Sequence, residues 1–247
     1  VAAALREDTL LVTIMQVNNE LGTINDIAAI AQLCRSRGVL SHTDGAQSFG
    51  KMPIDIKELG VDLYSISAHK VYGPKGMGAL YVRRSEGLRL AAQIHGGGHE
   101  MGMRSGTLAT HQIVGLAAAS ELMQSEMVQA HAKYVGLRNC FLRHIQQIPE
   151  HRINSHPTDN LPQILNVGFA GVDGETLMLA LNGLAVSSGS ACTSASVEPS
   201  HVLRGVGLAD DIAHASLRFS FGRFTQIDEV ESAGEQVANV VGRLREI

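Results

Sequence analysis

The sequence predicts an α/β fold in which a mixed, mostly parallel sheet is flanked by helices. Short apolar runs alternate with helical segments through the first third of the 247 residues, and this alternation is typical of parallel sheets. A hydrophobic content of 45% can supply a substantial core and one or two domains. We expect two domains, residues 1–126 and 127–247, with the boundary inside a helical stretch.

The first domain is expected to begin with a buried strand at residues 10–17. Asn25 or Asp26 can cap the helix that follows, and Gly38 can end it after Arg37. Further strands are predicted at residues 39–43, 61–67 and 78–83, with a short helix at 54–59.

The second half of the chain opens on a helical stretch, residues 110–148, which is poor in Gly and Pro. Beyond it we expect a smaller α+β domain in which strands and helices again alternate. Its strands are predicted at residues 164–169, 185–187 and 216–221, and its helices at 174–182, 199–206 and 228–245.

Composition excludes several classes of protein. A net charge of −4 and a pI of about 6.3 argue against general nucleic-acid binding. No apolar run approaches membrane-spanning length, and no signal-peptide pattern opens the chain. We interpret the dense basic cluster Arg83, Arg84 and Arg89 as solvated surface, with an acidic partner as the less favoured interpretation.

The three cysteines are too few for a disulfide framework in a chain of this length. Cys34 and Cys140 lie on helical apolar stripes, so both are expected in the core. Cys192 instead lies among small residues at 187–194, with no large side chain to bury it. A soluble protein in a reducing compartment follows, with one accessible thiol.

Polar residues of different chemistry follow three of the predicted strands. Asn19, Asp44 and Lys70 each fall at or just beyond the carboxyl end of a strand, where open α/β sheets bind ligands. Alone, Asn19 and Asp44 are ordinary turn or cap residues and Lys70 an ordinary solvated lysine. Together they favour a ligand site at that edge.

A pyridine aldehyde cofactor needs such a set of groups. Lys70 can bind the aldehyde carbon, and Asp44 can keep the ring nitrogen protonated so that the ring accepts electrons. Ser67 and His69 flank Lys70 with donors for a phosphate, and Gln47 can reach the ring hydroxyl. The pattern predicts pyridoxal phosphate.

The chain resembles the cysteine desulfurases of the iron–sulfur-cluster assembly type, which are pyridoxal-phosphate enzymes of the aminotransferase fold class. The resemblance extends over the chain in the family's order, and its cysteine segment is similar to the subgroup with a long mobile loop. The matching segments are residues 17–20, 42–47, 67–76, 95–100, 103–107, 187–194 and 217–223.

The resemblance implies the aminotransferase-like fold type I, with residues 1–126 as part of the large cofactor domain and 127–247 as the small domain. It implies that Lys70 bonds the cofactor and that Cys192 takes the sulfur. His95 is a candidate proton shuttle, although an ordinary turn histidine remains open, and His99 is a weaker candidate. The other implied residues are Asn19, Asp44, Gln47, Ser67 and His69 for the cofactor, Thr107 donated to it across a dimer interface, and Asn19 again, with Arg218, for the substrate carboxylate.

The implied reaction converts L-cysteine to L-alanine and leaves a persulfide on Cys192. The implied partners are a second copy of the chain, an iron–sulfur scaffold protein and other sulfur acceptors, with no membrane and no direct nucleic-acid binding. Cys192 would at most transiently contact an iron–sulfur cluster on a partner, and no metal site is expected in the chain. The location would be the cytoplasm, or the mitochondrial matrix in a eukaryote.

Two other interpretations stay open on sequence alone. One is a different pyridoxal-phosphate lyase or aminotransferase of the same fold, which needs no thiol. The other is a truncated, non-catalytic dimerisation or partner-binding module, because the family has over a hundred residues ahead of the position of Val1. Those residues include a phosphate loop and a ring-stacking histidine, so we expect weak or absent pyridoxal-phosphate binding by this chain alone.

Overall fold

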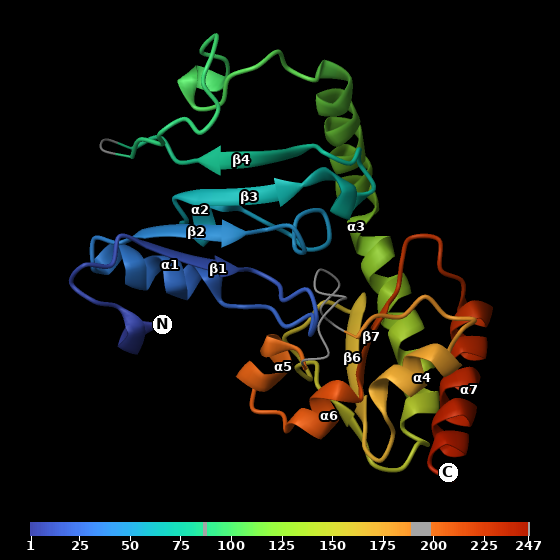
Figure 1. Ribbon diagram of the computed structural model, residues 1–247. Helices are drawn as coiled ribbons and strands as arrows, with labels where there is room; N and C mark the ends of the chain where they lie inside the picture. The colour runs from blue at the N-terminus through green and yellow to red at the C-terminus, as the bar shows by residue number, and fades with distance from the viewer. Residues whose placement is uncertain (86–87, 189–198, 247) are drawn as a thin grey trace. The chain divides into compact units, whose positions relative to one another are not determined.

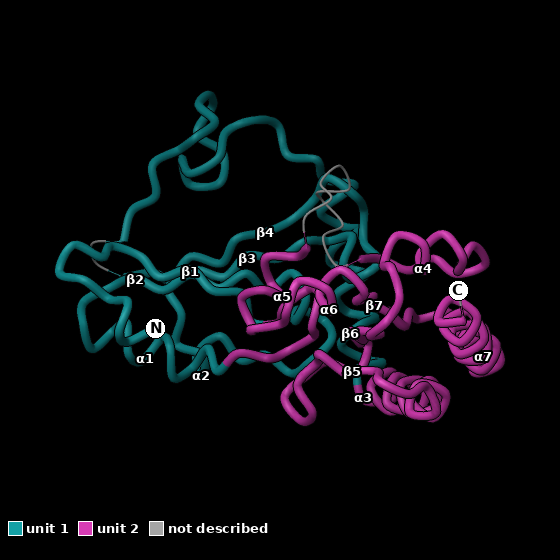
Figure 2. Tube along the Cα trace, turned by 60° about the horizontal axis from the view of Figure 1, so that its bottom comes forward, with its two compact units in different colours: residues 1–16, 26–127 teal, residues 17–25, 128–247 magenta. Residues whose placement is uncertain are grey.

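The computed structural model describes residues 1–85, 88–188 and 199–246 and divides into two compact units. Unit 1 comprises Val1–Gln16 and Asp26–Met127, and unit 2 comprises Val17–Asn25 and Val128–Ile247 (Figure 2). The helix α3, Thr110–Ile145, runs across the change from one unit to the other.

Unit 1 is built on a four-stranded sheet with the order β1-β2-β3-β4 (Figure 1). β1, β2 and β3 are parallel, and β4 pairs with β3 in the antiparallel direction. The parallel strands bring their carboxyl ends to one edge of the sheet, where ligands bind in open α/β sheets. The elements are β1 Leu11–Met15, α1 Ile27–Ser36, β2 Leu40–Asp44, α2 Ile56–Leu59, β3 Leu63–Ser67 and β4 Gly78–Val82, with 3-10 turns at Ala2–Ala4, Ala68–Val71 and Glu100–Gly102.

The helix α1 covers one face of this sheet. Its amino end is capped by Asp26, whose side chain accepts a hydrogen bond from the Ala29 N–H at 3.0 Å, and its carboxyl-terminal cap is Arg37. Its buried residues include Ala31, which packs in a cluster with Val61 and Tyr64. The predicted helix is therefore confirmed, with Asp26 as the cap.

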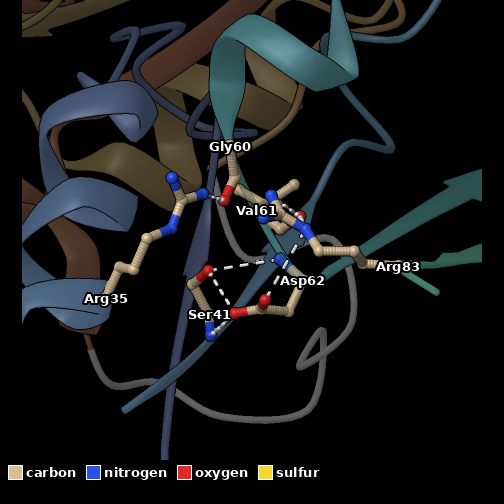
Figure 3. Close-up of polar contacts among 6 residues, drawn as sticks. All are labelled: Arg35, Ser41, Gly60, Val61, Asp62 and Arg83. Carbon is tan, nitrogen blue, oxygen red and sulfur yellow. Dashed lines mark hydrogen bonds and ion pairs between the residues drawn. The ribbon is translucent and has the colours of Figure 1, made fainter. Parts of the chain in front are cut away.

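A polar network ties together the other ends of β2 and β3 (Figure 3). The Asp62 carboxylate accepts from the Ser41 N–H at 2.8 Å and from its hydroxyl at 3.0 Å. Arg83, at the end of β4, donates to the Val61 carbonyl at 2.8 Å and forms an ion pair with Asp62 at 3.7 Å. Arg35 of α1 donates to the Gly60 carbonyl at 2.6 Å. Arg83 thus has a structural role, in contrast to the solvated surface expected for its basic cluster.

Unit 2 contains a three-stranded antiparallel sheet with the order β5-β6-β7. β6 is buried at all six positions, and the core around it includes Phe141, Cys140 and Val237. The elements are β5 His151–Ile153, β6 Ile164–Phe169, α4 Gly174–Ala180, α5 His201–Gly205, α6 Asp210–His214, β7 Ser216–Ser220 and α7 Ile227–Leu244, with the later part of α3.

Three features of unit 2 differ from the sequence prediction. Residues 185–187 form no strand, because only Ser187 pairs, through a single bridge to Arg218. β5 and α6 were not predicted, since His151–Ile153 is short and α6 is only Asp210–His214. The mixed α/β fold itself is confirmed.

Cys34 and Cys140 are both buried, as predicted. Among the described residues, no helix is both long and apolar enough to cross a membrane.

Candidate active site

Asp44 and Gln47 come to the sheet edge on a single turn after β2. Asp44 is the last residue of β2, and its side chain accepts from the Ala46 N–H at 2.8 Å. The chain then coils, with a hydrogen bond from the Phe49 N–H to the Gly45 carbonyl at 2.8 Å. The Asp44 side chain is exposed and Gln47 is partly buried. The turn therefore presents a carboxylate and an amide at the end of β2.

Tyr64 of β3 holds this turn against the sheet. Its buried hydroxyl donates to Gln16 Oε1 at 2.9 Å and lies 2.7 Å from Ser48 Oγ. A Cβ at Gly45 would overlap the Tyr64 ring, so only glycine fits there without displacement of the ring. Burial raises the pKa of Tyr64 to about 12, so the hydroxyl keeps its proton at neutral pH.

Lys70 lies on the 3-10 turn Ala68–Val71, directly after β3. Residues three apart in such a turn share a face, and Ala68 and Val71 are both buried, against Leu116 and Met123 among others. His69 and Lys70 between them are exposed. The packing of two small apolar side chains therefore presents the lysine at the sheet edge.

Ser67 and His69 form a hydrogen-bonded pair beside the lysine. Ser67 Oγ lies 2.9 Å from His69 Nδ1. Since β2 and β3 are neighbouring parallel strands, with Asp44 in register with Ser65, the Asp44 turn and the Lys70 turn leave the same sheet edge. Unit 1 brings together Asp44, Gln47, Ser67, His69 and Lys70 at this edge.

His95 and Thr107 lie in the segment between β4 and α3, and both are exposed. Within the described part of the chain, neither side chain hydrogen-bonds to Asp44, Gln47 or Lys70. Their suggested roles remain predictions. His99, the weaker candidate, accepts from the Gly106 N–H at 3.4 Å.

Asn19 lies in unit 2, on a tight turn that precedes α1. The Asn18 side chain accepts from the N–H groups of Glu20 and Leu21, each at 2.9 Å. Gly22 adopts a left-handed φ of 75° at the end of the turn, which glycine tolerates without a steric cost. The turn is fixed to unit 2 because Leu21 packs with Leu203 and other apolar residues.

Arg218 contacts this turn from β7. Its guanidinium donates to the Asn19 carbonyl at 3.1 Å. Among the described residues, its buried Nε has no hydrogen-bond partner. A buried, unpaired donor of a charged group is costly, which makes Arg218 a candidate for binding an anionic ligand.

Ser187 and Ser200 are described residues that precede and follow Cys192 in the sequence, and each is fixed by a contact within unit 2. Ser187 pairs with the Arg218 backbone, with the Arg218 N–H 2.7 Å from the Ser187 carbonyl. Ser200, which caps α5, donates to Glu20 Oε2 at 2.6 Å, and both side chains are buried. Cys192 itself lies outside the described residues. Sequence reasoning missed the Glu20–Ser200 pair, because nothing local links residues so far apart.

A hollow of about 680 Å³ in unit 1 is separate from these groups. It is lined by Arg84 and Arg89 of the basic cluster and by residues 101–103, none of which is a predicted site residue. Within the ranges that the structure describes, no group of three or more His, Cys, Asp or Glu side chains could hold a metal ion.

The donor set of unit 1 fits pyridoxal phosphate. The exposed Lys70 amine, the Asp44 carboxylate and the hydroxyl–imidazole pair of Ser67 and His69 match the aldehyde, the ring nitrogen and the phosphate in chemical type. In unit 2 the Arg218 guanidinium, whose Nε has no partner among the described residues, matches the carboxylate of an amino-acid substrate in chemical type.

The fold and this donor set define an α/β protein of the aminotransferase-like class. A profile of the class-V aminotransferases matches residues 1–232. The chain belongs to the aminotransferase class-V family, whose members depend on pyridoxal phosphate.

The similar proteins include curated cysteine desulfurases named IscS. Those of Pseudomonas aeruginosa and Azotobacter vinelandii are each 58% identical over 247 residues, which is 100% of this chain and 61% of theirs. The chain thus spans about 61% of the length of these relatives.

Solved structures show the same fold. A NifS-like protein from Rickettsia africae has a TM-score of 0.87 and 29% identity, and the match covers 98% of this chain and 64% of that one. The DndA protein from Streptomyces lividans has a TM-score of 0.73 and 37% identity, over 88% of this chain and 62% of that one.

Proposed function

We propose that this protein is a pyridoxal-phosphate-dependent cysteine desulfurase, which converts L-cysteine to L-alanine and passes the sulfur to Cys192 as a persulfide. The 58% identity to IscS cysteine desulfurases along the whole chain supports this activity. So does the likeness to a structure described as SspA in complex with cysteine, with 36% identity and a TM-score of 0.75.

One structural observation carries the proposal. Lys70 stands exposed on a turn whose neighbours Ala68 and Val71 are buried, at the same sheet edge as Asp44. A lysine that is solvent-accessible but held on a rigid turn suits covalent attachment of an aldehyde. The neighbouring carboxylate suits a protonated pyridine nitrogen.

Each residue of unit 1 then has a defined task. When bound, pyridoxal phosphate supplies an electron sink for the charge that develops at the substrate Cα. Asp44 holds the proton on the ring nitrogen, and Gln47 donates to the phenolic oxygen. Ser67 and His69 bind the phosphate, with Thr107 donated by a second copy of the chain. The Lys70 amine would take up the proton from the substrate Cα.

The substrate carboxylate is assigned to unit 2. The Arg218 guanidinium, whose buried Nε has no partner among the described residues, would hold that carboxylate, and its contact with the Asn19 carbonyl orders the Asn19 turn. The planar donor fork of arginine suits a carboxylate better than a lysine would. Asn19 supplies a second polar group, and His95 is the candidate for proton transfer at the substrate sulfur.

Cys192 completes the reaction. Its thiolate attacks the sulfur of the bound cysteine, so an S–S bond forms as the Cβ–S bond breaks. The electron pair of the broken bond returns to the carbon skeleton, which takes up protons and leaves as alanine. The thiolate is the reactive form of cysteine, so its pKa must be low enough for it to form near neutral pH.

The persulfide must then be passed on. We propose a homodimer that delivers sulfur to an iron–sulfur scaffold protein and to other acceptors, in the cytoplasm. The identity to IscS proteins supports this placement, and a different lyase or aminotransferase of the same fold would not need Cys192.

The test is the formation of alanine and of protein-bound persulfide from L-cysteine in the presence of pyridoxal phosphate. Lys70→Ala and Cys192→Ala should each reduce alanine formation to near the background rate. Lys57→Ala, which removes an exposed lysine of α2, is the matched control and should be fully active. Normal turnover by Cys192→Ala would refute the persulfide mechanism and favour another enzyme of this fold.

A further inference from the structure

Lys51 contacts one of the residues assigned to the cofactor. It lies four residues after Gln47 on the turn that follows β2, and its Nζ donates to Gln47 Oε1 at 2.9 Å. Residues four apart on a helical turn lie on the same face. The Lys51 N–H itself donates to the Ser48 carbonyl at 3.0 Å, which fixes the backbone beneath the contact.

This contact determines which way the Gln47 amide points. A lysine ammonium has three donors and no acceptor, so the amide group must turn its oxygen toward Lys51. The NH₂ group of the planar amide then faces away. In the described part of the chain, Gln47 Nε2 has no hydrogen-bond partner, so this donor remains available to a ligand.

The surroundings of Lys51 distinguish it from an ordinary surface lysine. Its side chain is partly buried. Burial, and secondarily the charge of Lys70, lower the pKa of Lys51 to about 8. The ammonium is therefore close enough to Lys70 to sense its charge, and it keeps a donor for Gln47 whether or not it loses a proton.

We propose that Lys51 is a positioning residue, which commits the Gln47 oxygen to itself and leaves the Gln47 NH₂ group to donate to the phenolic oxygen of pyridoxal phosphate. This rests on the proposed function, since it assumes that Gln47 faces the cofactor. Without Lys51 the amide can rotate, and its oxygen would then repel the phenolic oxygen for part of the time.

The contact is tested first without cofactor, by NMR of the ¹⁵N-labelled protein. The Gln47 side-chain NH₂ signals are assigned by their loss in Gln47→Ala. Lys51→Met, which keeps the length of the side chain and removes its donor, should shift these signals. Lys51→Arg should restore them toward the wild type, and Lys57→Met should leave them unchanged. Unchanged Gln47 signals in Lys51→Met would overturn the proposal.

The consequence is tested with pyridoxal phosphate as the probe. Lys51→Met should weaken its binding roughly tenfold, which is the usual scale for loss of one oriented hydrogen bond. Gln47→Leu should weaken pyridoxal-phosphate binding by a similar factor. The double variant should bind only slightly more weakly than either single variant, because both changes remove the same interaction. Additive losses, or unaltered affinity in Lys51→Met, would contradict the positioning role.

The two proposals fail in different ways. If borohydride traps pyridoxal phosphate on another lysine while Lys70 stays unmodified, the proposed function fails, and the NMR result still decides whether Lys51 orients Gln47. If the wild type forms the adduct at Lys70 and Lys51→Met binds pyridoxal phosphate as tightly, only the inference about Lys51 fails.

Discussion

The Tyr64 ring occupies the space that a side chain at position 45 would need. Its hydroxyl links Gln16 of the chain after β1 to Ser48 of the turn after β2. One buried aromatic residue thus joins three segments at the edge that carries Asp44. Its partners could not be found from sequence, because Gln16 and Tyr64 are 48 positions apart.

Gly45→Ala should therefore destabilise the protein through overpacking. The backbone at this position has no left-handed φ, so the expected cost of about 1–3 kcal/mol comes from displacement of the Tyr64 ring. The measurement is the free energy of unfolding in urea. Tyr64→Leu should recover part of the loss in a double variant.

Gly136→Ala is the matched control. It lies in α3, and among the residues that the structure describes no atom outside its own helical turn comes within 4 Å of the position that a Cβ would occupy, so alanine should stabilise the helix by about 1 kcal/mol. If Gly45→Ala were as stable as the wild type, the contact with Tyr64 would not be tight.

The lowered pKa of Lys51 predicts that the stability of the protein depends on pH. Its pKa in the folded protein is lowered from 10.5 to about 8, by burial first and by Lys70 second. Between these values the unfolded state binds more protons than the folded state, so stability rises with pH from about 8 toward 10.5 and falls as pH drops through this window.

Urea unfolding at pH 8 and pH 10 would measure this effect. The gain in stability with pH should be larger for the wild type than for Lys51→Met, which has no group to titrate. Measurements stop near pH 10 because Tyr64, with its pKa raised to about 12, adds a loss of stability above that pH. Equal pH dependence in the two proteins would show that Lys51 titrates normally.

At the scale of elements, local signals predicted most of the helices and strands. α1 had a cap, an apolar stripe and a terminal glycine, and its observed bounds Ile27–Ser36 agree with them. β5 and α6 were missed because three and five residues carry too little periodicity. The residues 185–187 were wrongly predicted as a strand, because only Ser187 pairs with β7, through a single bridge to Arg218.

The helix α5 depends on a buried cap. Ser200 accepts from the Val202 N–H at 3.1 Å and donates to the buried Glu20 carboxylate at 2.6 Å. Ser200→Ala should cost about 2–4 kcal/mol, since it removes a cap and deprives a buried carboxylate of its donor. Thermal or urea unfolding would measure the loss.

Asp55→Ala provides the comparison, because Asp55 caps α2 on an exposed part of unit 1. Its loss should lower the free energy of unfolding by only about 1 kcal/mol. A loss for Ser200→Ala no larger than for Asp55→Ala would mean that the Glu20 contact contributes little. Ser200→Thr, which keeps the hydroxyl, should retain much of the stability.

At the scale of the whole molecule, the sequence predicted candidate site residues more readily than the contacts that support them. Asp44, Gln47 and Lys70 were predicted because each follows a strand and each suits a distinct chemical role. Lys51 was not identified, although its spacing of four residues from Gln47 was a usable signal. Glu20 and Ser200 had no such signal, because their contact depends on the tertiary fold of unit 2.

The candidate residues are distributed over both units. Unit 1 carries the groups assigned to the cofactor, and unit 2 carries Asn19, Arg218 and the sequence around Cys192. The proposed activity takes Lys70 of unit 1 as the point of attachment for the cofactor.

The most direct measurement is borohydride reduction of the purified protein after incubation with pyridoxal phosphate, followed by peptide mass spectrometry. We expect a reduced pyridoxyl group on Lys70, ahead of Lys51, Lys57 and Lys75, and its loss in Lys70→Arg. Labelling of another lysine while Lys70 stays unmodified would contradict the assignment of Lys70.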